Sequence, residues 1–453
     1  MNNSGYQAKR LLQLAIPVFI AQITQTLMGF IDTVMAGQIS AVDMAAVAVG
    51  TSLWLPTLLF VQGLILVFTP VFSELDGANQ RSAIQPLVHQ ASYIALFGAL
   101  GVMLLLSSST IILDKMDLEP QLHSLSTGYI NYFLWGAPAF LLYQVLRGSS
   151  EGISHTLPPM IISFVGLAVN IPANYIFIHG KFGMPALGGA GCGVATALVF
   201  WAMFIAMLVY MFIDKKLKSL DIFGKFHKPD FGKIFRMVKL GFPIAMALFF
   251  EVSLFAVIAL LLAPLGANVV ASHQIALNFS SIVFMLPLSI GIAVSIRVGY
   301  YLGREKLDIA KLATKVGIFI GLGLATCTAI FTVLFKYEIA LLYNNNPEVV
   351  AMAGSLMLLA GLYQISDSIQ VVTAGALRGY KDTKSAFYIT FVSYWLVGMT
   401  IGYVLAYTNY IVEPMGARGF WIGLIAGLST AAILFAWRLL YVQRNKIRVE
   451  LSS

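Results

Sequence analysis

Three carboxylates in this chain are enclosed by apolar sequence, where they could exchange protons or bind cations. Asp32, Glu251 and Asp367 stand inside long hydrophobic runs, whereas the other seventeen of the twenty acidic residues fall in loops, tails or helix ends. A carboxylate within hydrocarbon costs about 2.5–3.5 kcal/mol or more. No basic residue lies comparably deep to neutralise these three. We expect them to be protonated or to bind a cation, the alternative being protonated acids that only tie two helices together.

Neutral oxygens accompany these acids at helical spacing. Tyr363 precedes Asp367 by four residues, so the two share a helix face, and Asn170 and Asn174 are spaced in the same way. Pro172, between the asparagines, frees a backbone carbonyl nearby. These side chains are candidate cation ligands. The alternative for the asparagines is an interhelical hydrogen bond, worth only about 0.6 kcal/mol on average in a membrane.

Composition places these residues in a membrane protein. The chain has 453 residues, of which 59% are hydrophobic and only 11% charged, and its mean hydropathy is +0.84. A soluble domain carries roughly 25% charged residues. At about 20 apolar residues per crossing, the sequence predicts twelve transmembrane helices, which begin near Leu11, Met44, Leu87, Ser124, Pro158, Leu187, Phe235, Val269, Leu312, Val349, Ser385 and Gly416.

Basic residues predict the orientation. With the N-terminus in the cytoplasm, 24 of the 28 basic residues fall in cytoplasmic loops and tails, and four lie outside: Lys115, Lys181, Lys336 and Arg418. This bias indicates that both termini are cytoplasmic. The net charge of +8 is therefore spread over loops on one membrane side, and it predicts no nucleic-acid partner. The two cysteines lie in apolar segments far apart and predict no disulfide framework.

The two halves of the chain resemble each other. Pro17 matches Pro243 at an offset of 226, the "VLRG" at 145 matches the "ALRG" at 376 at an offset of 231, and Gly188 matches Gly416 at an offset of 228. Six helices per copy make the copies parallel. We expect an N-terminal six-helix lobe at 1–213, a cytoplasmic linker at 214–234 and a C-terminal six-helix lobe at 235–453. The linker is expected to be a solvated basic loop near anionic lipid headgroups.

Several classes of protein are disfavoured by what the sequence lacks. It contains no GxxxxGK[ST] loop, no HExxH and no soluble domain large enough for a nucleotide, so we expect no cofactor, and energy for transport must come from an ion gradient. A membrane-embedded enzyme would need a metal or nucleophile constellation. A major-facilitator transporter would usually carry a glycine- and arginine-rich loop where this chain has "SELDGANQRSA". A lipid-precursor flippase should have a cationic central cavity, whereas the enclosed charges here are acidic.

The sequence resembles the multidrug and toxic compound extrusion (MATE) transporters, in particular their bacterial NorM branch, over essentially its whole length. The motifs that carry the likeness are "MGFIDTVMAG" (28–37), "VLRGSSEG" (145–152), "LGFPIAMALFFEVSLFAV" (240–257), "VASHQIALNFSS" (270–281) and "GALRGYKD" (375–382). The resemblance implies two six-helix lobes that form an outward-opening V, and export of cationic aromatic drugs against inward sodium or protons. Chain length and the absence of eukaryotic-style tails favour a bacterial inner-membrane protein, and we expect a monomer.

The resemblance further places a second-lobe cation site on Glu251, Asp367, Tyr363, Asn170 and Asn174, and an acidic first-lobe cavity residue on Asp32. Two carboxylates with neutral oxygens suit a hard cation without strong directional bonding. We therefore expect sodium at Glu251 and Asp367, with protons competing for the same carboxylates and Asp32 carrying protonation. Coupling to protons alone remains the alternative. The acidic cavity and the abundant Phe, Tyr and Met predict cationic, planar, apolar substrates.

Overall fold

The computed structural model describes residues 3–116 and 118–452, with side chains up to Asn445, and in these residues the chain is helical with no strand. Eleven helices in this part are long and apolar enough to cross a membrane. The remaining predicted crossing, near Ser124, is formed by two helices joined through a 3-10 turn at Leu134–Gly136. Polar residues such as Gln144 lower its hydropathy. The predicted all-α fold with twelve membrane helices is confirmed.

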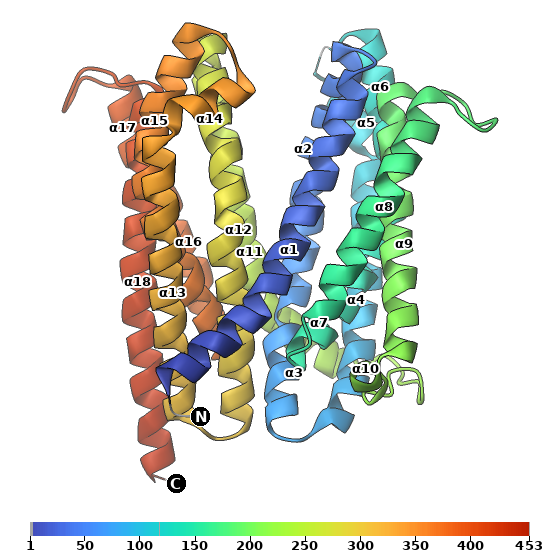
Figure 1. The fold of residues 1–453 in the computed structure, drawn as a ribbon, viewed down its shortest axis with the longest axis vertical. Helices are drawn as coiled ribbons and strands as arrows, with labels where there is room; N and C mark the ends of the chain where they lie inside the picture. The colour runs from blue at the N-terminus through green and yellow to red at the C-terminus, as the bar shows by residue number, and fades with distance from the viewer. Residues whose placement is uncertain (1–2, 117, 453) are drawn as a thin grey trace. The chain divides into compact units, whose positions relative to one another are not determined.

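Contacts divide the chain into two compact units. The N-terminal unit is Ile20–Ala245, and the C-terminal unit is Met1–Phe19 with Met246–Ser453. The N-terminal unit contains the end of α1 (Ser4–Gly37), the start of α11 (Phe231–Leu262) and the helices between them, namely α2 (Ala41–Leu66), α3 (Phe68–Gly77), α4 (Ile84–Ser107), α5 (Ser109–Leu113), α6 (Pro120–Phe133), α7 (Ala137–Gly152), α8 (Leu157–His179), α9 (Gly191–Ile213) and α10 (Lys215–Lys218) (Figure 1).

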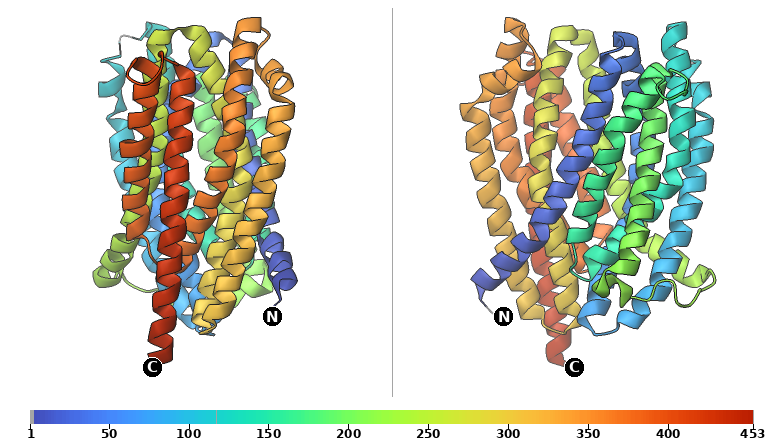
Figure 2. Two further views of the ribbon diagram at one scale, coloured as in Figure 1. Left: turned by 90° about the vertical axis from the view of Figure 1, so that its left-hand side faces the viewer. Right: turned by 45° about the vertical axis from the view of Figure 1, so that its right-hand side comes forward.

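The C-terminal unit contains the start of α1, the end of α11 and the rest of the chain. Its further helices are α12 (Ala267–Gly303), α13 (Leu307–Leu334), α14 (Lys336–Tyr343), α15 (Pro347–Gly379), α16 (Lys384–Thr390), the π-helical segment η5 (Phe391–Met399), α17 (Thr400–Tyr407) and α18 (Ala417–Ser452). Helix α15 packs against α12, α13 and α18. The start of α1 and the end of α18 lie at the same end of this unit (Figures 1 and 2).

The division differs from the boundaries predicted at 1–213 and 235–453, because it falls inside two helices. It cuts α1 after Phe19 and α11 after Ala245, two residues beyond Pro17 and Pro243 respectively. A proline inside a helix removes a backbone hydrogen bond and favours a bend, so each helix has a natural place to leave one unit for the other. The C-terminal unit thus includes the start of α1, the first helix of the first repeat. The N-terminal unit includes the start of α11, the first helix of the second repeat.

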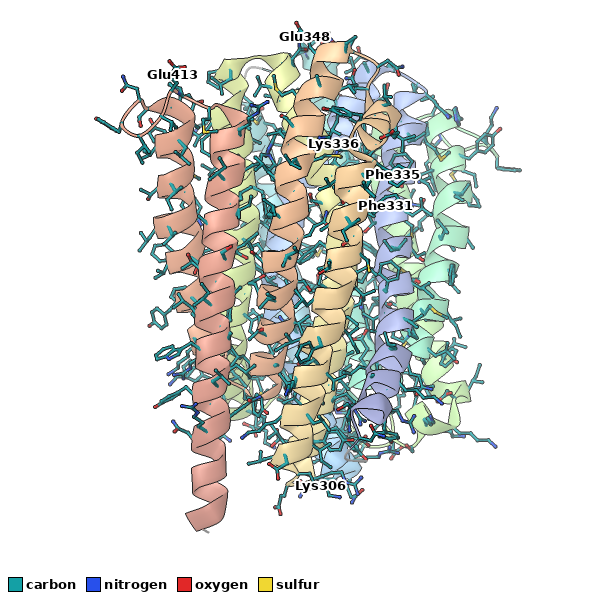
Figure 3. All side chains as sticks on the ribbon, turned by 60° about the vertical axis from the view of Figure 1, so that its left-hand side comes forward. Lys306, Phe331, Phe335, Lys336, Glu348 and Glu413 are labelled. Carbon is teal, nitrogen blue, oxygen red and sulfur yellow. The ribbon has the colours of Figure 1, made fainter. Side chains whose placement is uncertain are left out.

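Side chains on the outside of the helices are suited to lipid. On α4, Phe97, Leu100 and Leu104 are 60%, 55% and 63% exposed, and on α13 Phe319 is 63% exposed. Water would make these surfaces costly, whereas hydrocarbon does not. Figure 3 shows Lys306 at one end of the C-terminal unit and Lys336 and Glu348 toward the other, as the alternation of loops requires. The side chains of Lys446 and Arg448, assigned to the cytoplasmic side, lie outside the described residues.

Candidate functional site

Asp32 lies in the N-terminal unit, where three polar side chains from two other helices contact it. Asn170 Nδ2 and Asn174 Nδ2 of α8 donate to Asp32 Oδ1 over 2.8 Å and 2.6 Å. Thr196 Oγ1 of α9 lies 3.1 Å from Asp32 Oδ2 and 2.8 Å from the carbonyl of Cys192, so its single proton is shared. Asp32 itself is 6% exposed. We call these four residues the Asp32 cluster.

The Asp32 cluster corrects the grouping expected from the sequence. The family resemblance groups Asn170 and Asn174 with Glu251 and Asp367, but both amides bond Asp32 in the N-terminal unit, while Glu251 and Asp367 belong to the other unit. The i, i+4 spacing on α8 correctly predicts that the two amides act together. It does not identify their partner, which lies 138 residues from Asn170 in the sequence.

The geometry of the Asp32 cluster suits a carboxylate that changes its state. Three donors surround the two carboxylate oxygens, so a negative charge is stabilised although it is buried. The amide oxygens of Asn170 and Asn174 are buried without a hydrogen-bond partner among the described residues. Rotation of an amide about its last side-chain torsion would exchange NH₂ for oxygen, which could then accept from a protonated Asp32 or coordinate a cation.

In the C-terminal unit, Asp367 lies in the middle of α15 with its Oδ1 buried and unpartnered in the described part of the chain. Its side chain borders a small cavity between α12, α13 and α15, which Ser280, Thr328 and Gln364 also line. The cavity has room for about one water molecule or bare ion. Asp367 and Gln364 are 2% and 4% exposed, so this polar surface is well separated from bulk solvent.

Neutral oxygens face this region. Gln364 donates Nε2 to Thr332 Oγ1 over 2.9 Å, which leaves its amide oxygen without a partner. The hydroxyls of Ser280 and Ser368 are likewise buried and unpartnered within the described residues. An oxygen with a free lone pair in a dry site is costly unless a cation, a proton or a water molecule meets it. We call Asp367, Glu251, Tyr363, Gln364, Ser280 and Tyr394 the Asp367 cluster.

Glu251 and Tyr363 belong to the same unit as Asp367. Electrostatic interactions join Glu251 to Asp367 and to Tyr363. Tyr363 is 6% exposed, and its ring meets the edge of Trp421 at 5.7 Å between centroids. Glu251, on α11, is only partly buried. Three of the five residues predicted for the second-lobe site are therefore electrostatically coupled, and a charge on either acid opposes a charge on the other.

Arg378 corrects the expectation that no basic residue lies near the enclosed acids. It is partly buried on α15 and interacts electrostatically with Glu251. Its counterpart in the first repeat, Arg147, instead forms a buried ion pair with Glu151, with Nε–Oε1 at 2.6 Å. The acid four residues after Arg378, Asp382, pairs with Arg438 at 2.6 Å. The repeated arginine thus has different partners in the two units: Glu151 in the first, and Glu251 in the second, where Asp382 pairs with Arg438.

Four residues of these clusters were not found from the sequence. Thr196, Ser280 and Gln364 have no local signal, since polar residues of these types are common in membrane helices. Tyr394 has a structural one: it lies in the π-helical segment η5, and such segments often occur at functional sites. Its hydroxyl is buried and unpartnered within the described chain, and Tyr394 interacts electrostatically with Glu251 and Asp367.

The donor sets fit a monovalent cation or a proton. Among the side chains described, in residues 3–116 and 118–445, no group of three or more His, Cys, Asp or Glu is arranged to hold a metal ion. The Asp367 cluster instead combines carboxylates with hydroxyl and amide oxygens, which are hard ligands without strong geometric demands.

Comparison with known proteins extends this picture over the whole chain. The family model MatE matches residues 17–176 and 243–404. A probable multidrug resistance protein NorM from Shewanella oneidensis is 69% identical over 451 residues, covering 100% of this chain and 98% of the relative. The multidrug resistance protein NorM from Aliivibrio fischeri is 52% identical over 442 residues, covering 98% and 96%.

Solved structures share the fold at low sequence identity. The eukaryotic MATE transporter AtDTX14 superposes with a TM-score of 0.89 at 20% identity, over 98% of each chain. The Vibrio cholerae MATE transporter VcmN in its bent form gives 0.85 at 17% identity, over 99% of each chain. The full-length sequence relatives and the matched family model show that the chain is not an enzyme but a transporter of the MATE family, in its bacterial NorM branch.

Proposed function

We propose that this transporter exports cationic, aromatic drugs and dyes across the bacterial inner membrane in exchange for inward sodium, by alternating access. The observation that carries the proposal is the Asp367 cluster, in which the buried carboxylate of Asp367 and the unpartnered oxygens of Gln364 and Ser280 border a cavity the size of an ion. A second acid, Glu251, interacts electrostatically with Asp367. The names of the sequence relatives, which are multidrug resistance proteins, support the substrate class.

Sodium binds at Glu251 and Asp367 in this proposal, and the hydroxyl and amide oxygens of the Asp367 cluster replace part of its hydration shell. Protons compete for the same carboxylates, because neutralising either acid removes the attraction for a cation. Cationic substrates are favoured for the same reason, since their charge replaces that of the departing ion in low dielectric. The energy of the sodium gradient thereby drives release of the drug to the other side.

Asp32 carries protonation in the first lobe. The three donors around it stabilise the charged form, and rotation of Asn170 or Asn174 offers an acceptor to the protonated form. Both termini face the cytoplasm in this proposal, the protein acts as a monomer, and the outward-opening V implied by the family resemblance stays a prediction.

The test is Glu251→Gln, which keeps the shape of the side chain but removes its charge. The variant should reach the membrane at normal abundance yet export ethidium and norfloxacin-like cations at less than roughly a tenth of the normal rate, because a lost ion contact of about 1.4 kcal/mol already costs tenfold. Asp367→Asn should behave in the same way. Glu338→Gln, an exposed acid in the first turn of α14, is the matched control. Normal efflux by Glu251→Gln at equal abundance would show that Glu251 is structural.

A further inference from the structure

Side chains at the start of α4 hold the backbone of the linker between α9 and α11, although most side chains of the linker itself are exposed. Four residues of α4 make these hydrogen bonds: Gln85 to the carbonyl of Asp221, His89 to that of Ile222 at 2.7 Å, Gln90 to that of Lys228 at 3.1 Å, and Tyr93 to that of His227 at 2.9 Å. Gln90 also accepts from the backbone N–H of Asp230 at 2.8 Å. The linker is thus a built part of the N-terminal unit.

With its backbone held in this way, the linker buries its aliphatic side chains and leaves its aromatic side chains exposed. Leu217, Leu220 and Ile222 are buried at 1%, 2% and 5% exposure. Phe223 and Phe226 remain 50% and 77% exposed. The fixed backbone therefore presents aromatic rings outward although the same segment has already buried three aliphatic residues.

The exposed rings lie at the ends of membrane-spanning helices. Phe223 stacks on Phe212, in the last turn of α9, with centroids 4.6 Å apart and planes at 22°. Phe226 lies with its ring 5.8 Å from that of His89 on α4. Directly after the linker, Phe231 and Phe235 at the start of α11 are 73% and 70% exposed. These contacts and the short connection keep the segment beside the membrane surface.

The linker and the start of α11 carry far more basic than acidic residues. Eight basic residues lie between Lys215 and Lys239, against three acidic residues from 214 to 239. Two of those acids are occupied by backbone N–H groups: Asp214 accepts from Lys216 and Leu217, and Asp230 accepts from Lys233. Burial acts to raise the pKa of Asp214, but these N–H groups and His155 hold that pKa below its ordinary value. Lys233 also pairs with Asp230 at 3.6 Å, whereas Lys225 and Lys228 are exposed.

We propose that the linker surface, defined as Phe223, Lys225, Phe226, Lys228, Phe231 and Phe235, binds the headgroups of anionic phospholipids in the surrounding bilayer. Aromatic rings favour the membrane–water interface. Each lysine near an anionic surface adds a favourable Coulomb term, and the docked backbone means that little ordering entropy is lost on binding. The occupant is a lipid rather than a soluble acidic segment, because aromatic rings and lysines are combined at the ends of membrane spans. This inference does not depend on which ion drives transport.

The experiment places a reporter in the linker surface. Full-length protein carrying Phe226→Trp is reconstituted into phosphatidylcholine vesicles that contain an equal fraction of brominated phosphatidylglycerol or brominated phosphatidylcholine. The quenching of the parent protein, which has six native tryptophans, is subtracted. Quenching of the introduced indole should be stronger with the brominated anionic lipid, and the excess should shrink at high salt.

Two further variants decide the cause. Lys225→Gln with Lys228→Gln, in the reporter background, should lower the preference for the anionic lipid roughly thirtyfold. The matched control, Lys306→Gln with Lys315→Gln, removes two lysines elsewhere and should keep it. Equal quenching by the two lipids, or a preference that survives the Lys225 and Lys228 changes, would overturn the proposal. If neither lipid quenched the introduced indole but soluble polyglutamate shifted its emission, the surface would bind an acidic protein segment instead.

Discussion

At the scale of residues, Asp32 and Asp367 meet opposite kinds of neighbours. Asp32 has hydrogen-bond donors at both of its oxygens, whereas Asp367 has one oxygen without a partner among the described residues and a second acid nearby. Donors lower the cost of a buried charge on Asp32, which suits a carboxylate that gains and loses a proton. Asp367 lacks such a donor at Oδ1 and needs a cation or a proton there, so the two aspartates are suited to different steps of one exchange cycle.

Thr196→Val tests the role of the donors around Asp32. The change keeps the shape of the side chain but removes the hydroxyl near Asp32 Oδ2, and a hydrogen bond to a charged group is worth about 1.5–3 kcal/mol. We expect drug efflux to fall roughly tenfold at equal protein abundance. Thr24→Val is the control, because Thr24 is similarly buried but bonds only a carbonyl of its own helix. Equal losses in both variants would make the effect one of packing.

Arg378→Gln tests whether the positive charge near Glu251 weakens sodium binding. Removing it should make Glu251 more attractive to a cation, so the sodium concentration for half-maximal transport should fall roughly three- to tenfold. Lys384→Gln removes an exposed charge nearby in the sequence and should leave it unchanged. A higher sodium requirement in Arg378→Gln would mean that the arginine positions Glu251 rather than competing with the ion.

The enclosed acids can be identified from the sequence because an apolar run around a carboxylate is visible locally. The oxygens that gather around each acid cannot. Asn174 and Asp32 are 142 residues apart, and only the packing of α8 against α1 brings them together. Arg378 belongs to a motif expected in a cytoplasmic loop, yet it interacts with Glu251, while Asp382 four residues later pairs with Arg438. Which partner each side chain contacts depends on the tertiary packing of the helices, which local sequence does not show.

At the scale of elements, glycines set how closely the helices around Asp32 approach. A Cβ on Gly193 of α9 would lie 2.3 Å from the backbone oxygen of Tyr129 on α6. Backbone of a neighbouring helix does not yield as a flexible side chain would. The absence of a side chain at Gly193 therefore permits the close approach of α9 to α6, and this contact keeps α9 in place to present Thr196.

Gly193→Ala should lower the thermal stability of the purified protein, because forcing an extra methyl into a packed interface typically costs about 1–3 kcal/mol. Gly101→Ala is the matched case, since Gly101 also lies in a helix but has no neighbouring atom within 4 Å of where its new methyl group would lie. It should be neutral or stabilising, because alanine is the better helix former. A melting temperature that drops equally in both variants would contradict the close-contact explanation.

At the scale of the whole molecule, hydropathy and internal repetition are sufficient to predict twelve helices and a duplicated plan, because the bilayer fixes helix length. They do not predict where the units divide. The linker at 214–234 marks the boundary of the repeats, but the contacts change unit within α1 and α11, just after Pro17 and Pro243. In the sequence, Pro17 and Pro243 are noticeable only because they match each other in the internal repeat. Local hydropathy does not show that the helix contacts a different unit beyond each proline.

The most direct test of the account is ethidium efflux from proteoliposomes under an imposed sodium gradient, with no pH gradient and no membrane potential. The account predicts efflux by the normal protein that depends on sodium and is lost in Glu251→Gln and Asp367→Asn. It also predicts that sodium displaces bound drug. Efflux supported only by a proton gradient, with sodium neither stimulating transport nor displacing the drug, would contradict it and make the acids carriers of protons alone.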